Sequence, residues 1–200
     1  MTFDFITQIH DFLIRSEFYL KPWAEVIGIM WCINIVNWII GSRLNILGIY
    51  PRKLFGLIGI PFSPILHQNF SHLFFNSIVL YILGLAILAK DGTVVFGIIT
   101  AFIMILGGLG VWLFARKGVH IGASGLISGY FGYILMNAYA QPGIITIMLA
   151  ILAIYYFGGI LIGLFPQEKK TSWESHLFGF LSGILSVYLP TTTIMMYLHL

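Results

Sequence analysis

The sequence predicts an all-α fold: a polytopic membrane bundle of six transmembrane helices with a long, membrane-associated first loop. Hydrophobic residues make up 59% of the 200 residues, only 8% are charged, and the mean hydropathy is +0.97. Soluble domains are about one quarter charged, so this composition indicates a membrane protein. The charged residues cluster between apolar runs of about the twenty residues that one span needs. Because open sheets leave backbone polar groups unpaired in lipid, we expect these runs to be helices.

Residues 1–22 are expected to form an amphipathic helix at the membrane interface. Apolar residues recur there at helical spacing, and charged residues occupy the other faces. The apolar residues are Phe5, Ile9, Phe12 and Leu13. We therefore divide the chain into this N-terminal segment, a six-span membrane domain over residues 23–190 and a short C-terminal tail over residues 191–200.

Six apolar runs predict the spans of the membrane domain. They cover residues 24–41, 70–89, 94–115, 124–140, 144–165 and 175–189. Glycines, prolines and charged residues mark turns between the later runs. These turns lie at residues 90–92, 116–118, 141–143 and 166–170.

The connection between the first and second runs, residues 42–69, differs from the other turns. It is fairly apolar, yet Pro51, Pro61 and Pro64 interrupt it. A segment interrupted by prolines is unsuited to cross the membrane, and a segment this apolar is unsuited to be a linker in water. It therefore predicts a structured loop that rests partly in the membrane interface. We expect His67, near its end, to anchor the loop.

Polar residues inside the predicted spans are functional candidates, because a charged side chain at the bilayer centre costs about 2.5–3.5 kcal/mol. His72 and Asn76 lie four residues apart in the second run and so share one helix face. Ser124 begins the fourth run, and His176 lies near the start of the sixth. Even-numbered spans run in the same direction, so we expect all four side chains at one membrane face.

Small residues accompany both Ser124 and His176. They are Gly125, Ser128, Gly129 and Gly132 in the fourth run, and Gly179 and Gly183 in the sixth. Rows of this kind allow helices to approach closely, so the two runs are expected to pack together with Ser124 near His176. Helix packing alone would also explain these residues, and His72 and Asn76 can join helices by hydrogen bonds.

The predicted arrangement favours hydrolysis by a serine nucleophile. A serine hydroxyl reacts poorly until a base takes its proton, and His176 can be that base if it comes within about 2.6–3.2 Å. The charge that develops on the substrate carbonyl oxygen needs fixed donors. His72, Asn76 and the backbone N–H of Ser124, at a helix N-terminus, are the candidates.

Three motifs in this order resemble the rhomboid intramembrane serine proteases: HLFFN at residues 72–76, GASG at 122–125 and HLFGFLSG at 176–183. The resemblance covers the chain from the first run to the sixth. It implies a dyad without an aspartate, in which Ser124 is the nucleophile and His176 the general base and acid. It also implies oxyanion or substrate-binding roles for His72, Asn76 and Gly122, and helix-packing roles for Gly125, Gly129, Gly179 and Gly183.

The resemblance further implies partners and location. The expected substrates are transmembrane proteins cut near the membrane surface, with membrane lipid around the bundle and residues 166–174 as a gate over the site. A multi-pass protein of the bacterial inner membrane with an outward-facing active site is implied. The basic residues predict the opposite orientation, because seven Lys/Arg lie on the side of the first, third and fifth loops and three on the other side.

The sequence departs from the rhomboid pattern in two places. Many rhomboids carry a Trp-Arg pair in the first loop, which is absent here, and Ser128 stands where a tyrosine often stacks on the catalytic histidine. A base without an acidic partner depends on its neighbours for orientation. The departure at Ser128 therefore raises the question of what orients His176.

Two other functions stay open: an inactive rhomboid-like protein that binds membrane helices, and a small membrane transporter. Inactive relatives resemble rhomboids that lack the serine or the histidine, and both are present here, while a transporter is expected to show an internal repeat. The sequence predicts no cofactor, no metal site and no nucleic-acid partner, since Cys32 is its single cysteine and it contains no HExxH motif. It specifies no oligomeric state.

Overall fold

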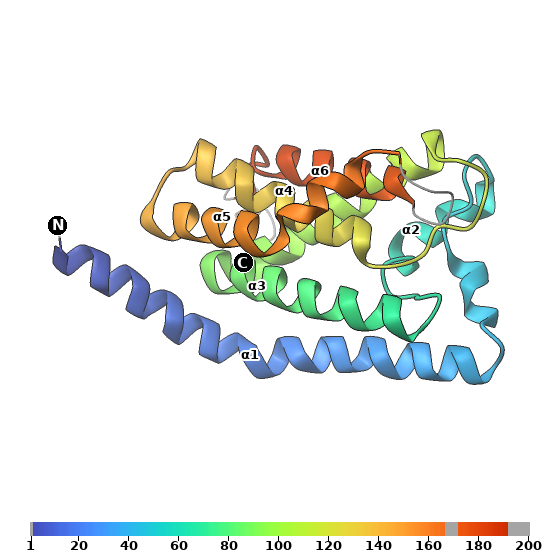
Figure 1. Ribbon diagram of the computed structural model, residues 1–200, viewed down its shortest axis with the longest axis horizontal. Helices are drawn as coiled ribbons and strands as arrows, with labels where there is room; N and C mark the ends of the chain where they lie inside the picture. Colours follow the sequence, from blue (N-terminus) through green and yellow to red (C-terminus); the bar gives the residue numbers. More distant parts are fainter. Residues whose placement is uncertain (1, 167–171, 192–200) are drawn as a thin grey trace.

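The computed structural model describes residues 2–166 and 172–191 as a bundle of helices (Figure 1). Its elements are α1 (Thr2–Ile39), η1 (Arg43–Leu47), η2 (Leu54–Leu57), α2 (Gly59–Phe62), α3 (Phe70–Phe114), α4 (Ser124–Ala140), α5 (Ile144–Phe157), η3 (Gly158–Leu164) and α6 (Trp173–Ser186). The predicted C-terminal tail lies almost wholly outside the described residues. The predicted gate at residues 166–174 lies only partly within them.

Helix α1 joins two segments that the sequence analysis treated as separate. It runs from Thr2 to Ile39 and contains Pro22, so the amphipathic segment and the first span form one continuous helix. Just after the proline, Trp23 is buried and its indole N–H donates to the carbonyl of Tyr81 at 3.1 Å. The side chain fits because Gly84 faces it; a Cβ there would lie 2.6 Å from the indole ring.

Helix α3 contains the second and third predicted runs. Gly92 interrupts it with a φ of 79° and a ψ of 170°. These values lie outside the helical region, and glycine adopts them readily. The chain turns back there, so the arms over residues 70–91 and 93–114 contribute to one core cluster, with Leu80 and Leu83 from the first arm and Ile99 and Ile103 from the second. The predicted break at residues 90–92 is therefore a turn within one long helical element.

Within residues 2–166 and 172–191, three helical elements are long and apolar enough to cross a membrane: Asp4–Ile39, Phe70–Phe114 and Ile144–Leu164, which combines α5 with η3. Helices α4 and α6 have 17 and 14 residues, lengths of about 26 and 21 Å at 1.5 Å per residue, against a hydrocarbon core of about 30 Å. Ten residues of α4 are buried. Helix α4 therefore lies inside the bundle, whereas α6 packs one face against α4 and leaves Leu181 and Leu185 exposed.

The six predicted runs thus correspond to six helical segments, with corrected ends. The fifth run is α-helical only to Phe157 and then tightens into the 3₁₀ segment η3. The sixth helix begins at Trp173, two residues earlier than expected, and ends at Ser186 instead of residue 189.

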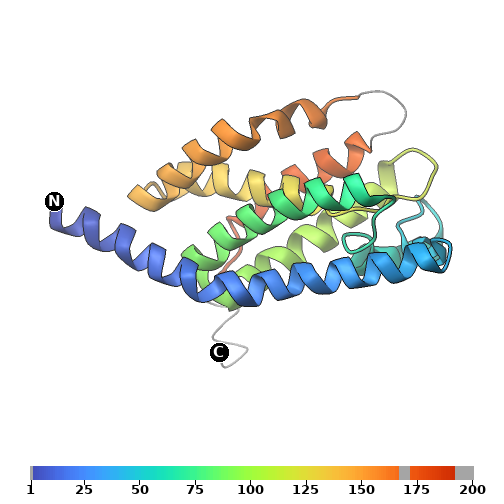
Figure 2. The same cartoon turned by 60° about the horizontal axis from the view of Figure 1, so that its bottom comes forward.

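The predicted first loop is structured and packs against the connection between α3 and α4. Ile49 and His120 exchange backbone hydrogen bonds of 3.0 and 2.9 Å, and the backbone N–H of Gly122 donates to the carbonyl of Ser63 at 2.8 Å. Figures 1 and 2 place this loop at the same end of the bundle as the start of α4 and of α6. The loop therefore braces the end of the molecule that carries the candidate site.

Candidate active site

A cavity of about 1120 Å³ lies among α3, α4, η3 and α6 at this end of the bundle. The four polar residues singled out in the sequence line it together: His72, Asn76, Ser124 and His176. Ser128 lines it as well, one turn after Ser124, and is buried. The fold thus brings together side chains that are separated by up to 104 positions along the chain.

Ser124 is the first residue of α4, so its backbone N–H lies at the positive end of the helix dipole. Gly122, two residues before it, has a φ of 119°, a conformation that favours glycine. A Cβ on Gly122 would lie 2.6 Å from His72 Cε1 and 3.6 Å from Asn76 Nδ2. Gly122 therefore provides both the turn that leads into α4 and the space for two side chains of α3.

His72 and Asn76 occupy the first two turns of α3. The side chain of Asn69 caps the helix by accepting a hydrogen bond of 2.9 Å from the His72 backbone N–H. Asn76 is held from behind by His67, whose Nε2 lies 3.1 Å from Asn76 Nδ2. The orientation of the Asn76 amide, which lines the cavity, is therefore fixed by His67.

His67 links the oxyanion candidates to the rest of the fold. Its Nδ1 lies 3.1 Å from the carbonyl oxygen of Ile65, which can only accept, so Nδ1 carries the proton and Nε2 accepts from Asn76 and from the Ala123 backbone N–H at 3.3 Å. Burial, together with the nearby His72, holds the pKa of His67 well below its usual range, which keeps the ring neutral. The sequence analysis expected a loop anchor, but it did not foresee this contact with Asn76.

His176 lies in the first turn of α6. Its Nδ1 is 3.1 Å from the carbonyl oxygen of Gly163 in η3, so Nδ1 carries the proton and Nε2 is left to act as a base. Within the described part of the chain, no hydrogen bond joins His176 to Ser124. The two residues share the cavity wall, and catalytic hydrogen bonds are often long before substrate binds.

Glycines set the approach of α6 to α4. A Cβ on Gly179 would collide with the carbonyl oxygen of Gly125, and one on Gly183 would collide with that of Gly129. Gly179 also lies against α3, where a Cβ on Gly107 would be 3.4 Å from the Gly179 Cα. Helix backbones are thus in direct contact on both sides of α6, and this contact sets the depth of His176 relative to Ser124.

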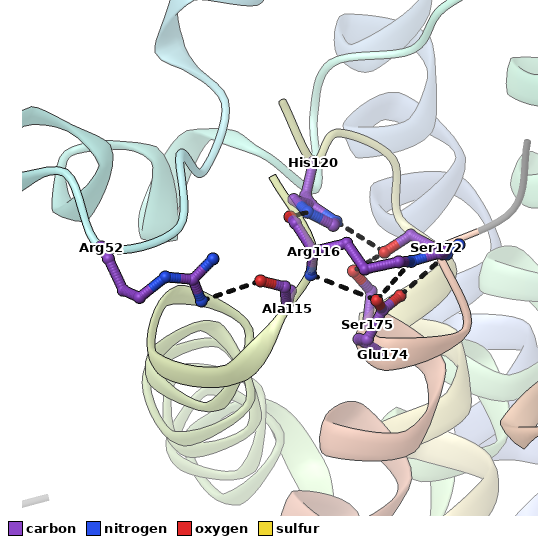
Figure 3. Close-up of polar contacts among 7 residues, drawn as sticks. All are labelled: Arg52, Ala115, Arg116, His120, Ser172, Glu174 and Ser175. Carbon is purple, nitrogen blue, oxygen red and sulfur yellow. Dashed lines mark hydrogen bonds and ion pairs between the residues drawn. The ribbon is translucent and has the colours of Figure 1, made fainter. Parts of the chain in front are cut away.

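A polar cluster at the start of α6 was not identified from the sequence (Figure 3). Arg116 donates from Nε to Glu174 Oε1 at 2.6 Å and from Nη2 to Oε2 at 3.2 Å. Its backbone N–H also donates to Oε1, at 3.2 Å. Glu174 is buried and lies two residues before His176. The sequence marked Arg116 only as part of a turn, because pairing across 58 residues leaves no local signal.

His120 extends this cluster toward the cavity, which it also lines. Its Nε2 donates to the Arg116 carbonyl at 3.0 Å, so its Nδ1 accepts from the Ser172 hydroxyl at 2.6 Å. The Ser172 and Ser175 hydroxyls are 2.7 Å apart. The connection between α3 and α4 is therefore fastened to the beginning of α6 by side-chain hydrogen bonds.

Among residues 2–166 and 172–191, no group of three or more His, Cys, Asp and Glu side chains could hold a metal ion. Cys32, on α1, is exposed and lies outside the cavity.

Comparison with known proteins identifies a family for this chain. The family model described as the Rhomboid domain matches residues 52–191. The uncharacterized protein Rv1337 of Mycobacterium tuberculosis is 37% identical over 173 residues, which cover 82% of this chain and 71% of the relative. The uncharacterized protein ML1171 of Mycobacterium leprae is 32% identical over 172 residues, or 81% and 67% of the two chains.

A Bacillus subtilis protein with the name "Putative rhomboid protease YdcA" is 30% identical over 131 residues, which cover 62% of this chain and 63% of the relative. The family match includes the four polar residues of the cavity and the glycines that join α4 to α6. On the strength of this match, the helical bundle described here belongs to the rhomboid family.

Proposed function

We propose that this protein is an intramembrane serine protease that hydrolyses peptide bonds of transmembrane protein substrates. The observation that carries the proposal is that four polar residues line the same cavity: Ser124, His176, His72 and Asn76. The protein is an integral membrane protein of the rhomboid family. One relative of this family carries the name "Putative rhomboid protease YdcA".

In the proposed acylation step, His176 Nε2 takes the proton of the Ser124 hydroxyl as the serine oxygen attacks the substrate carbonyl carbon. The protonated ring then gives this proton to the leaving amine as the peptide C–N bond breaks. The hydrogen bond from His176 Nδ1 to the Gly163 carbonyl supports this assignment, because it leaves Nε2 as the basic nitrogen. Water then enters through the cavity and attacks the acyl carbon while losing a proton to the same nitrogen. The ring returns this proton to the Ser124 oxygen as the ester bond breaks, which frees the serine and releases the acid.

The oxyanion would be held by His72, the Asn76 amide and the backbone N–H of Ser124. Loss of one donor of this kind typically costs about 2.7–4 kcal/mol in the transition state. The contact between His67 and Asn76 supports the assignment, since preorganised donors need fixed orientations. Gly122 belongs to this binding surface because it leaves room for His72.

We further propose that the protein lies in the bacterial inner membrane with its active site facing outward, and that residues 23–190 form the proteolytic unit. The relatives found are bacterial, which supports the first part. The first part of α1, up to Pro22, would then lie at the membrane interface as an extension of the first span.

A fluorophosphonate probe tests the proposed nucleophile in the purified full-length protein. Labelling of the wild type, its loss in Ser124→Ala and His176→Ala, and its retention in Ser16→Ala would support the dyad. Ser16 is a matched control because it lies on α1 outside the cavity and its hydroxyl donates to the Phe12 carbonyl at 2.8 Å. A rhomboid protease known to react serves as the positive control.

The same experiment separates the second candidate, a rhomboid-like protein that binds membrane helices without cutting them. That candidate is favoured by the missing hydrogen bond between Ser124 and His176 among the described residues. An unlabelled wild type beside a labelled control would overturn the proposed protease and favour this alternative.

A further inference from the structure

The C-terminal end of α5 has an unusual hydrogen-bond pattern. After Phe157 the helix tightens into the 3₁₀ segment η3, in which each carbonyl accepts from the N–H three residues later. The bond of 3.3 Å from the Phe165 N–H to the Ile162 carbonyl follows this rule. The next bond of this kind would join the Gly163 carbonyl to the N–H of residue 166, but Phe165 is extended, with a φ of −101° and a ψ of 154°, and residue 166 is Pro166, which has no N–H. A proline also disfavours the helical conformation at the residue before it, so the helix ends here.

The histidine of the proposed dyad uses the Gly163 carbonyl. His176 Nδ1 lies 3.1 Å from the Gly163 oxygen and donates to it. The approach is possible because residue 163 has no side chain, since a Cβ there would lie 2.8 Å from Nδ1 and 3.4 Å from Cε1. Unlike Gly122, Gly163 does not have a positive φ, so the requirement for glycine here is steric.

No carboxylate takes this role among the residues that the structure describes around His176. Glu174, two positions earlier, is occupied by three hydrogen bonds from Arg116. Ser128, one turn after Ser124, offers no aromatic ring. A neutral histidine exchanges between two tautomers unless a neighbour selects one.

We propose that Gly163 is a positioning residue, whose backbone carbonyl selects the Nδ1–H tautomer of His176 and so keeps Nε2 available as the base. Pro166 is its accessory, because it has no N–H and disfavours the helical conformation at Phe165 that would bring a competing N–H to that carbonyl. This inference rests on the proposed protease function for the role of His176. It adds that η3 orients the imidazole ring of His176, whereas α6 carries the backbone of this residue.

The first test compares two glycines of the same 3₁₀ segment. Gly163→Ala places a methyl group against the ring, while the matched control Gly158→Ala meets a single atom at 3.9 Å, an ordinary contact. We expect fluorophosphonate labelling of Ser124 to slow by about tenfold or more in Gly163→Ala, because general base catalysis contributes roughly 10²–10⁴-fold. The control should stay within about twofold of the wild type.

Pro166→Ala provides a milder variant that adds no atoms near the ring. It restores an N–H and removes the restriction that keeps Phe165 extended, so the 3₁₀ helix can continue by one residue and bond to the Gly163 carbonyl. We therefore expect labelling to slow by about two- to tenfold, the value of one ordinary hydrogen bond. Labelling at the wild-type rate in both Pro166→Ala and Gly163→Ala would overturn the inference while leaving the proposed protease intact.

The second test reads the tautomer itself and needs no catalysis. Nitrogen-15 NMR of the full-length Ser124→Ala protein, with labelled histidine and His176→Ala as the assignment control, should show a protonated Nδ1 and an unprotonated Nε2 at His176. Gly163→Ala in the same background should lose that signature, and Gly158→Ala should keep it. A protonated Nε2 in the parent protein would overturn the inference even if the wild type reacts with the probe.

Discussion

Gly122 shows how much of the site depends on one residue without a side chain. Its φ of 119° directs the chain into α4, and the absence of a Cβ admits His72 beside Asn76. The backbone conformation of Gly122 depends on neighbours in the sequence. The space for His72 depends instead on how α3 packs against this turn. His67 also supports the site from outside the helix that carries Asn76, because its ring contacts the Asn76 amide from the first loop.

Gly122→Ala should abolish most labelling of Ser124, because the added methyl group displaces His72. Gly118→Ala is the matched control. It has a φ of 145° and nothing within 4 Å of the added Cβ, so it carries the backbone strain of about 1–3 kcal/mol without the contact. We expect a loss of at least about tenfold in Gly122→Ala and a change below threefold in Gly118→Ala, measured as probe-labelling rates. Equal losses would attribute the effect to strain.

Acidification should destabilise the wild type through His67. Because burial lowers the folded pKa of His67, the ring contributes stability above its unfolded pKa of about 6.5 and loses it as the pH falls below that value. Thermal unfolding in detergent between pH 7 and pH 5 should show a larger decrease in Tm for the wild type than for His67→Gln, which cannot titrate. We expect a difference of at least about 2 °C. Parallel pH profiles would contradict the assignment.

At the scale of helices, α4 and α6 form a pair in which backbone meets backbone. The positions of Gly125 and Gly129 on α4 match those of Gly179 and Gly183 on α6. A packing surface without side chains leaves no rotamers to adjust, so it resists substitution more than an ordinary core does. The pair therefore sets the depth of His176, and the cluster of Arg116 and Glu174 fixes where α6 starts.

Gly183→Ala should lower Tm and labelling together, because the carbonyl of Gly129 cannot move aside without moving α4. We expect a loss of about 1–3 kcal/mol in the free energy of unfolding. Gly97→Ala is the control on α3: it meets nothing within 4 Å and should raise helix stability by about 0.5–1 kcal/mol. Melting curves of the two variants in the same detergent provide the measurement, and a stabilised Gly183→Ala would refute the packing role.

Glu174→Gln should weaken the start of α6. The substitution keeps the size of a buried side chain but removes the charge that accepts hydrogen bonds from the Arg116 side chain and backbone N–H. We expect a lower Tm and labelling slowed by about threefold to tenfold. Glu25→Gln, on the exposed surface of α1, should change neither quantity. A wild-type Tm in Glu174→Gln would show that the ion pair is dispensable.

At the scale of the molecule, polar groups concentrate at one end of an apolar bundle. The first loop, the connection between α3 and α4, and the start of α6 meet there, and the cavity opens among them. Among the described residues, α1, α3 and the α5–η3 segment are long and apolar enough to cross a membrane, while the short α4 is largely buried. Ser124 and His176 both line the cavity at this end.

The orientation of this end can be measured with cysteines in a Cys32→Ser background. Lys53→Cys lies in the first loop, and Gln141→Cys lies at the turn between α4 and α5, and both positions are exposed. With the proposed outward active site, a membrane-impermeant maleimide should label Lys53→Cys in intact cells, and Gln141→Cys only after lysis. The reverse pattern would favour the cytoplasmic active site that the seven basic residues predict.

The sequence by itself determined the class of the protein and the order of its polar motifs. Composition and helical spacing depend on local residues, so six helical segments, the face shared by His72 and Asn76, and the start of α4 at Ser124 could all be predicted. The sequence did not reveal that Pro22 lies within a continuous α1 or that the fifth run changes to a 3₁₀ helix, because packing can override local preference.

Only the tertiary structure decided how the candidate site is supported. The contacts of His67 with Asn76, of Arg116 with Glu174 and of His176 with Gly163 join residues 9, 58 and 13 positions apart. Each depends on the path of two backbones and leaves no periodic signal in either segment. Motifs encode which groups can react, whereas the hydrogen bonds that orient those groups arise only when the helices are packed.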